Sequence, residues 1–453
     1  MAATITVGGL ATGLDTNSII DQLVKIEHQP VDLLTQQQSE TQANQNSIAT
    51  LGQKLAALKA AADALRTPDD VLVRQASSSD DNVVTAAAGG GAPRGTTTLT
   101  ITQLAHGSVA GATIGLASTD ALVAAGAGTF QFQSGSGDVQ SIAVDGTTTL
   151  QQLVNAINDT KAGVTASAVN LGTDESPDYR LELVSQSTGA TSTITIVHDD
   201  TSLAVETTQA GQDAQFSVDG FSGTFSRSSN TFSGVLPGVT FTASSVGTAT
   251  VTVTDDTDAI VKKAQALAAA FNDAIAFVDS ESTVAVTDDK NDAALGTLAT
   301  DSTARRIVSR LHAVFSESVA GLTGRSNLSS LGFATNKDTG QIDFDAGKFT
   351  AALSADPDGV AAVFAGAGDA SGVAGDLSSL IDGTTAADGA LSTHARALGD
   401  QIRSLQDQID AGQRKVDAFE ADLRQQFASL ETLVSGLNSQ GSFLQSALSA
   451  KSA

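Results

Sequence analysis

An apolar stripe near the end of the chain limits its possible folds more than any other feature. Between Leu391 and Leu448 apolar residues recur in alternating steps of four and three, and Gly412 fills the one gap in the run. This spacing predicts a long amphipathic helix whose apolar face needs a partner helix. The stripe comprises Leu398, Ile402, Leu405, Ile409, Val416, Phe419 and Leu423, continued by Leu430 and Leu437 and widened by Leu433 and Val434.

Two interpretations of this helix are open. It is either one long helix of a monomeric bundle, or a surface on which subunits assemble. The widening after Leu423 favours assembly, because a broad apolar face suits a bundle or an oligomer better than a two-stranded coiled coil. If continuous, the helix extends on the order of 85 Å at about 1.5 Å per residue.

A second stripe near the start of the chain is the natural partner of the first. It comprises Ile48, Leu51, Leu55, Leu58, Ala62 and Leu65, and Pro68 ends it. Before it, an amphipathic pattern begins at Asn17, and Pro30 either interrupts that pattern or restarts it as a first-turn proline. The run from Gln36 to Gln45 is nearly all polar and has little to bury. We expect the two stripes to pair antiparallel, which brings the chain ends together.

The middle of the chain reads mainly as strands. Alternating residues predict strands within 71–105 and 213–254, and residues 128–200 predict the order β-α-β-β-β. In that unit Thr149 and Gln152 form a capping-box pattern before a short helix, and Asp145-Gly146 is a hairpin-turn dipeptide. Later helices are predicted to begin near Asp256, Ser302 and Pro357, and residues 366–390 resemble a linker.

Composition excludes several classes of partner. The 453 residues carry a formal net charge of −26, with no run of basic residues. Nucleic acid and anionic membranes are therefore poor partners, since both require local positive charge. No stretch approaches the roughly 18 apolar residues of a membrane span, and residues 1–24 show no signal-peptide pattern. We expect no membrane insertion and, if the protein leaves the cell, a route without a cleaved leader.

No convincing active site is visible, and we expect no enzyme, no metal and no cofactor. Cysteine is absent, and the five histidines are far apart in sequence. The spacing of Gly8 and Gly13 resembles a phosphate loop, but Leu14 stands where the lysine belongs. Asn336-Lys337-Asp338-Thr339-Gly340 resembles the start of a calcium loop but lacks its glycine and its final glutamate, so a tight turn is favoured.

Several short motifs, in order, resemble the flagellar hook-associated protein 2 family, the filament capping proteins. The N-terminal motifs are residues 9–15 (Gly-Leu-Ala-Thr-Gly-Leu-Asp), 19–23 (Ile-Ile-Asp-Gln-Leu), Glu27 and Pro30. The C-terminal motifs are residues 216–220, 238–241, 251–254, 271–272, 331–333, 340–345 and 356–357. The resemblance covers most of the chain and is least specific at about 110–205.

The fold class we predict is α+β, with long terminal helices pairing as a coiled-coil or helical-bundle leg and β-rich head domains inserted between them. The flexible ends are residues 1–40 and 438–453. The leg comprises residues 41–105 and 256–437. The head comprises residues 106–127 and 206–255, with an α+β domain at 128–205 inserted between these two parts.

The resemblance implies a cap at the distal end of the extracellular flagellar filament, which retains exported flagellin and promotes its folding and polymerisation. It implies a ring-shaped homo-oligomer, with flagellin, the hook-filament junction proteins and the flagellar type III export apparatus and chaperone as further partners. An adhesin that binds host mucin or surface glycans is the alternative, and a cytoplasmic coiled-coil scaffold is a third possibility.

Two sets of site residues follow from these predictions. Leg pairing or oligomer contact is assigned to the two stripes, namely Ile48, Leu51, Leu55, Leu58, Leu65, Leu398, Ile402, Leu405, Ile409, Val416, Phe419, Leu423, Leu430 and Leu437. Contact with the filament or the hook junction is assigned to the N-terminal motif, namely Gly9, Leu10, Gly13, Leu14, Asp15, Ile19 and Leu23.

Overall fold

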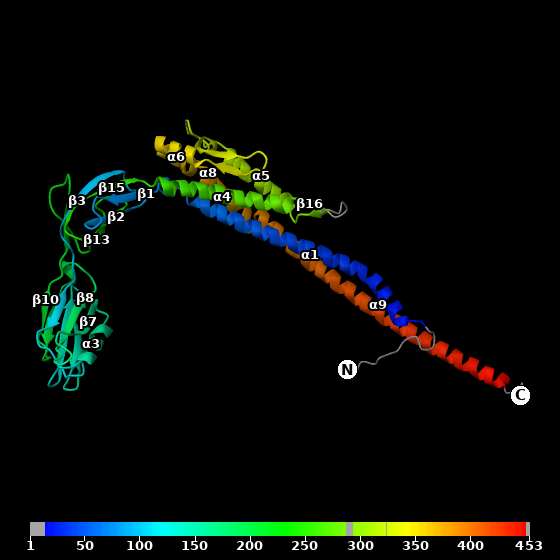
Figure 1. Cartoon of the computed structure of the whole chain (residues 1–453), viewed down its shortest axis with the longest axis horizontal. Helices are drawn as coiled ribbons and strands as arrows, with labels where there is room; N and C mark the ends of the chain where they lie inside the picture. Colours follow the sequence, from blue (N-terminus) through cyan, green and yellow to red (C-terminus); the bar gives the residue numbers. More distant parts are fainter. Residues whose placement is uncertain (1–13, 287–292, 323, 450–453) are drawn as a thin grey trace. The chain divides into compact units, whose positions relative to one another are not determined.

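The fold is that of a computed structural model, which describes residues 14–286, 293–322 and 324–449 (Figure 1). The chain divides into two compact units, one made of Met1–Arg66 with Lys262–Ala453 and the other of Thr67–Val261. The first unit is mainly helical and the second is mainly antiparallel sheet. The predicted fold class, α+β with terminal helices around a β-rich insertion, is therefore confirmed.

Long helices from both ends of the chain form the first unit. Its helices are α1 (Thr16–Asp63), α4 (Thr257–Ser282), α5 (Ser302–Ser316), α6 (Ala346–Ala355), α7 (Pro357–Ala365), α8 (Val373–Thr385) and α9 (Ala390–Ser449). Short elements connect them: β16 (Val284–Val286) with β17 (Ala293–Leu295), η2 (Leu328–Leu331), β18 (Phe333–Thr335) with β19 (Ile342–Phe344), and β20 (Gly366–Ala367) with β21 (Ala370–Ser371).

Helix α1 is continuous through its proline. The carboxylate of Asp15 accepts a hydrogen bond from the Ser18 N–H at 3.1 Å and caps the first turn. Pro30 lies inside the helix on an exposed position, so the prediction that it interrupts or restarts the pattern is wrong. The prolyl ring removes one backbone donor, yet packing of the neighbouring Val31, only 4% exposed, holds this part of the helix in place.

The later segments contradict one prediction and confirm another. Residues 366–390 are not a linker, because they contain β20, β21 and α8. In α8 the residues Val373, Leu377 and Ile381 recur in steps of four and are all buried, a pattern hidden by the surrounding Gly, Ala and Ser. The predicted helix starts near Asp256 and Ser302 are confirmed. The Asp256 carboxylate accepts a hydrogen bond from Ala259 N, and the Asp301 carboxylate accepts one from Thr303 N.

The second unit contains two cores. One lies between a five-stranded sheet of order β1-β15-β3-β11-β12 and a three-stranded sheet of order β13-β14-β2. Leu99 and Val251 point into this core, while Thr98 and Thr250 pair on the opposite face at 3.0 Å. The elements are α2 (Pro68–Val71), β1 (Arg74–Ser78), β2 (Val84–Ala88), β3 (Gly95–Gln103), β11 (Ala214–Val218), β12 (Phe225–Arg227), β13 (Thr231–Ser233), β14 (Val239–Ala243) and β15 (Gly247–Asp255).

The other core belongs to the predicted α+β module. Sheets of order β10-β4-β8-β7 and β6-β5-β9 enclose it with α3, whose capping box of Thr149 and Gln152 is present. Asp145-Gly146 does not form a hairpin, because β6 ends there and leads into α3. The elements are β4 (Val109–Ala112), β5 (Gly128–Ser134), β6 (Gln140–Val144), α3 (Leu150–Asp159), β7 (Val164–Asn170), β8 (Tyr179–Ser185), η1 (Ala190–Ser192), β9 (Ile194–Asp199) and β10 (Val205–Gln209).

Strand pairing joins segments that the predicted domain division assigned to different domains. Strands β1 and β3, which the sequence analysis grouped with the leg, pair with β15, and β3 also pairs with β11. Alternation reveals a strand but not its partner, because pairing depends on contacts distant in sequence. The division into flexible ends, leg and head stays a prediction in its exact bounds.

Candidate functional site

Polar contacts between α1 and α9 define the register of the leg. Nε2 of Gln38 donates to Oε1 of Gln406 at 2.8 Å, and Nε2 of His28 lies 2.9 Å from Oε1 of Gln413. Numbers fall along α1 as they rise along α9, so the two helices run antiparallel, side by side (Figure 1). These residues were not predicted as contacts; the only signal in the sequence was the presence of Gln and His residues in two amphipathic helices.

The predicted stripe of α9 grades from buried to exposed along the helix. Its early members lie against neighbouring helices, and its last members face solvent in the described structure. Leu398, Leu405 and Val416 are buried, Ile402, Ile409, Phe419 and Leu423 are half-buried, and Leu430 and Leu437 are 49% and 57% exposed. The single chain therefore covers only the first part of the predicted stripe.

The predicted stripe from Ile48 to Leu65 is fully buried, but most of it does not pack against the α9 stripe, its predicted partner. Ile48, Leu51, Leu55, Leu58 and Leu65 are at most 1% exposed. The part near Leu58 and Leu65 packs by α8, where Ser378 donates to Asp63 at 2.8 Å. Helix α9 begins at Ala390, beside Gly52, so most of its own stripe faces α1 residues that precede Ile48.

An ion pair accompanies the contact of α1 with α8. Lys59 Nζ lies 2.7 Å from Asp63 Oδ2 and 3.5 Å from Asp382 Oδ2. The hydrogen bond from Lys59, followed by that from Ser378, lowers the pKa of the Asp63 carboxyl. The same bond to Asp63 raises the pKa of Lys59. Both groups therefore stay charged over a wider pH range than they would alone.

The described residues among those assigned to filament contact lie in the first turns of α1 or just before it. Gly9, Leu10 and Gly13 lie outside the described residues. Leu14, Ile19 and Leu23 are 53%, 36% and 37% exposed, whereas Asp15 caps the helix. Their role in contacting other subunits stays a prediction.

Exposed apolar side chains gather toward the ends of both leg helices, and we call them the leg-end surface. Continuing the antiparallel register carries the last turns of α9 past the start of α1, as Figure 1 shows. Large apolar side chains are costly to expose in such number, so this surface is suited to contact with other subunits. It comprises Leu14, Ile19, Leu23 and Ile26 of α1 and Leu430, Leu433, Leu437, Phe443 and Leu444 of α9.

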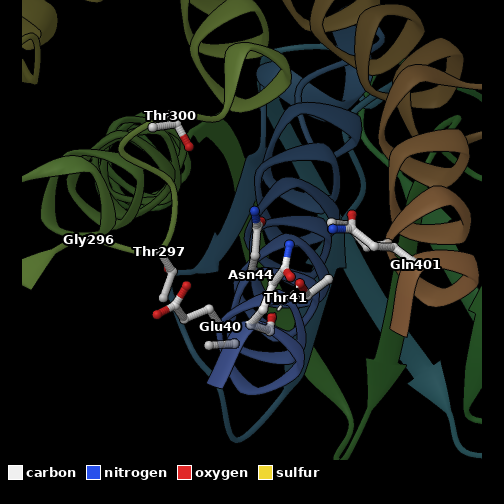
Figure 2. Close-up of a pocket in the computed structure, with 10 residues that line it drawn as sticks. Glu40, Thr41, Asn44, Gly296, Thr297, Thr300 and Gln401 are labelled. Atoms are coloured by element: carbon white, nitrogen blue, oxygen red, sulfur yellow. Dashed lines mark hydrogen bonds between the residues drawn. The ribbon is translucent and has the colours of Figure 1, made fainter. Parts of the chain in front are cut away.

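A polar cavity of about 650 Å³ lies in the same unit, between α1, the segment before α5, and α9 (Figure 2). Glu40, Thr41 and Asn44 line it from α1, and Thr297 and Gln401 face them. The buried Oδ1 of Asn44 has no protein hydrogen-bond partner in the described structure. Among the described lining residues Glu40 is the one titratable group, so the cavity offers no acid–base pair. The cavity therefore gives no evidence of a reaction site.

The histidines have separate surroundings in the described structure. His28 and His394 contact Asp32 and Asp301, and His198 contacts Asp200. His312 packs edge-on against a phenyl ring, and burial lowers its pKa. Among the described residues no group of three or more His, Cys, Asp or Glu side chains is placed to hold a metal ion, and no described helix is long and apolar enough to cross a membrane.

Comparison with known families gives matches over most of the chain. Residues 211–439 match the family described as Flagellar hook-associated protein 2 C-terminus, and residues 12–108 match Flagellar hook-associated protein 2 N-terminus. Residues 129–187, within the α+β module, match the Flagellin hook IN motif. The matched regions thus include both leg helices and the inserted module.

Individual relatives agree with these matches. The flagellar hook-associated protein 2 of Escherichia coli K12 is 28% identical over 464 residues, covering 98% of this chain and 97% of that protein. The B-type flagellar hook-associated protein 2 of Pseudomonas aeruginosa is 27% identical over 53% of this chain and 55% of its own. The crystal structure of the flagellar cap protein FliD D1-D2-D3 domains from Escherichia coli has a TM-score of 0.65 at 27% identity, covering 78% of this chain and 99% of that one.

Proposed function

Because this chain belongs to the flagellar hook-associated protein 2 family, we propose that it caps the distal end of the bacterial flagellar filament, where it retains exported flagellin and promotes its folding and polymerisation. The observation that carries this function is the sequence similarity to the flagellar hook-associated protein 2 of Escherichia coli K12 over 97% of that protein. The paired helices from both chain ends, with a β-rich insertion between them in sequence, agree with it. The protein is a structural component of the flagellum and not an enzyme.

The leg-end surface supports assembly as the way in which this function is carried out. Leu430 and Leu437 continue the stripe that pairs with α1 but are left exposed in the single chain. In a ring-shaped homo-oligomer, or against flagellin at the filament end, such side chains become buried and contribute about 1.5–3 kcal/mol each. We assign leg-end contact to these residues and to Leu14, Ile19 and Leu23.

Membership of this family also suggests further partners and a location for the chain. We propose the hook-filament junction proteins and the flagellar type III export apparatus with its chaperone as further partners, and an extracellular location at the flagellar tip. The adhesin alternative has no support in the comparisons and is not proposed.

A complementation experiment tests this function. A strain lacking the gene should be non-motile and should shed flagellin into the medium, and the unaltered chain should restore filaments. The double variant Leu430→Ser with Leu437→Ser should be exported but should restore few filaments. Filaments of normal length in the deletion strain would show that this chain is not the cap.

A matched control separates the effect of altering the leg-end surface from the effect of replacing any exposed leucine by serine. Leu33 is 66% exposed on α1 but lies outside the α9 stripe and outside the leg-end surface as defined. Leu33→Ser should therefore restore filaments as well as the unaltered chain does. An equal loss in this control would remove the special role of Leu430 and Leu437.

A further inference from the structure

A pocket of about 500 Å³ opens beside strand β12 in the β-rich unit. We call it the β12 groove; it is lined by Thr98, Val218, Phe221, Phe225, Val235 and Leu236, among others. Strand β12 is the edge of its five-stranded sheet, and among the described residues only β11 pairs with it. The groove thus lies next to an edge of the sheet.

A ladder of phenyl rings connects the groove with the core. Phe241 contacts Phe232 at 6.0 Å between ring centroids, Phe232 contacts Phe216 at 4.5 Å, and Phe216 contacts Phe225 at 5.8 Å. The first three rings are buried, and Phe225 is 37% exposed. The core therefore fixes the position of the rings that reach the groove, so the apolar wall is preformed.

The exposure of phenyl rings is concentrated here. Phe221 is 69% exposed, and it and Phe225 are two of the three exposed phenylalanines in the described part of the chain. The third, Phe443, lies in α9. Exposed aromatic side chains around a concave surface are characteristic of binding sites rather than of solvated loops.

The charge of the groove selects the kind of ligand. In a chain of net charge −26, the described lining of the groove holds one cation and one anion, Arg227 and Asp219, and otherwise threonine hydroxyls and apolar groups. The guanidinium of Arg227 lies 6.0 Å from the centroid of the Phe216 ring. The patch is thus locally neutral, and it complements an uncharged segment with apolar side chains better than an ion.

We propose that the β12 groove binds an extended, unfolded polypeptide segment in which apolar and polar residues alternate. The segment adds as a strand along β12, and its backbone hydrogen bonds supply affinity while one apolar side chain enters the groove. The occupant rests on the proposed function, since a cap that retains exported flagellin meets that chain before it has folded. The groove gives the cap a place at which to hold such a segment.

Peptide binding by the full-length chain tests this site. The probe is a fluorescein-labelled ten-residue peptide that alternates threonine and valine and has one central phenylalanine, titrated by fluorescence anisotropy. A second probe carries proline at the two positions flanking the phenylalanine, which removes backbone donors. The first probe should bind, and the second should bind at least tenfold more weakly.

Substitutions place the binding at the groove. Phe221→Ser and Phe225→Ser should each weaken binding of the first probe at least tenfold. Phe221 is mostly exposed, so its variant keeps the test valid if Phe225→Ser unfolds the sheet. Leu171→Ser is the matched control, because it removes a similarly exposed apolar side chain (64% exposed) outside both the groove and the leg-end surface, and it should leave binding within twofold of the unaltered protein.

Three results would overturn the proposal: no binding of the first probe, equal binding of both probes, or unchanged binding in both groove variants. Sedimentation distinguishes another occupant, since a lower oligomer mass in the groove variants would assign the groove to a second copy of this chain instead. Failure here is separable from failure of the cap function, because complementation of the deletion strain reports on capping alone.

Discussion

Gly412 of α9 lies so close to Val31 of α1 that a Cβ atom on the glycine would lie 2.8 Å from Cγ2 of the valine. Gly412 is the residue that fills the gap in the apolar stripe of α9. The gap is therefore occupied by the Val31 side chain of the other helix, and Val31 is only 4% exposed. Two positions 381 apart in sequence thus form a close contact between the leg helices.

Completing the stripe at this position should destabilise the leg. Gly412→Leu removes a helix-interior glycine and restores the heptad pattern, yet its side chain has no room beside Val31. We expect a loss of about 1–3 kcal/mol, typical of an overpacked contact, seen as a lower urea midpoint of the helical circular dichroism. Adding Val31→Ala should recover part of that loss.

Gly436 supplies the control, because it lies in the same helix with no heavy atom within 4 Å of the position that a Cβ atom would take. Gly436→Ala should stabilise the helix by about 1 kcal/mol. A stabilising effect of Gly412→Leu would mean that the close approach of Gly412 to Val31 is absent in solution.

A disulfide should report the register of the two helices. A Cβ atom on Gly412 would lie 3.9 Å from Cβ of Val31, close to the usual separation of about 3.8 Å in disulfides. The chain has no cysteine, so Val31→Cys with Gly412→Cys should give one unambiguous intramolecular crosslink, visible as a mobility shift on a non-reducing gel. Leu58→Cys with Gly412→Cys, which pairs another residue of α1 with the same glycine, should stay reduced within the monomer.

Many helices and strands of this chain follow from local sequence patterns, but the partners against which they pack do not. The capping box of Thr149 and the two apolar stripes follow from local patterns, and the family resemblance follows from short motifs in order. The register of α1 against α9 could not be predicted, because it depends on Gly412 accepting Val31 and on amide pairs between polar runs. Helix α8 escaped prediction for a related reason: its buried residues are spread among small ones.

Buried and exposed members of the α9 stripe should respond differently to the same change. Leu405 is 5% exposed and Leu430 is 49% exposed. Leu405→Asp places an unpaired carboxylate between the leg helices and should reduce the free energy of unfolding by several kcal/mol. The midpoint of helical unfolding should fall, while the β-rich unit stays folded. Half-buried Leu423 should give an intermediate loss with the same substitution.

Leu430→Asp should instead leave the stability of the isolated chain within about 0.5 kcal/mol while reducing oligomer mass in sedimentation. Equal losses of stability at Leu405 and Leu430 would indicate that the leg-end surface is already buried within the single chain. An unchanged oligomer mass for Leu430→Asp would remove this residue from the assembly contact.

The histidine of α5 should make the helical unit sensitive to acid. Burial lowers the pKa of His312, whose ring packs edge-on against Phe271 with centroids 5.3 Å apart. An unfolded histidine titrates near pH 6.5, so between that pH and the lower folded pKa the unfolded chain binds more protons. Stability contributed by neutral His312 is therefore complete above about pH 6.5 and is lost as the pH falls through the folded pKa.

The difference in urea midpoint between the unaltered chain and His312→Gln isolates this group, because the other titrations cancel. The unaltered chain should lose stability relative to the variant as the pH is lowered from about 8 to about 5, across the range in which histidine titrates, with helical circular dichroism as the readout. Ring titration followed by NMR should give a folded pKa below the ordinary histidine value of about 6.5 directly. A difference that stays constant with pH, together with an ordinary NMR pKa, would mean that His312 is solvated rather than packed against Phe271.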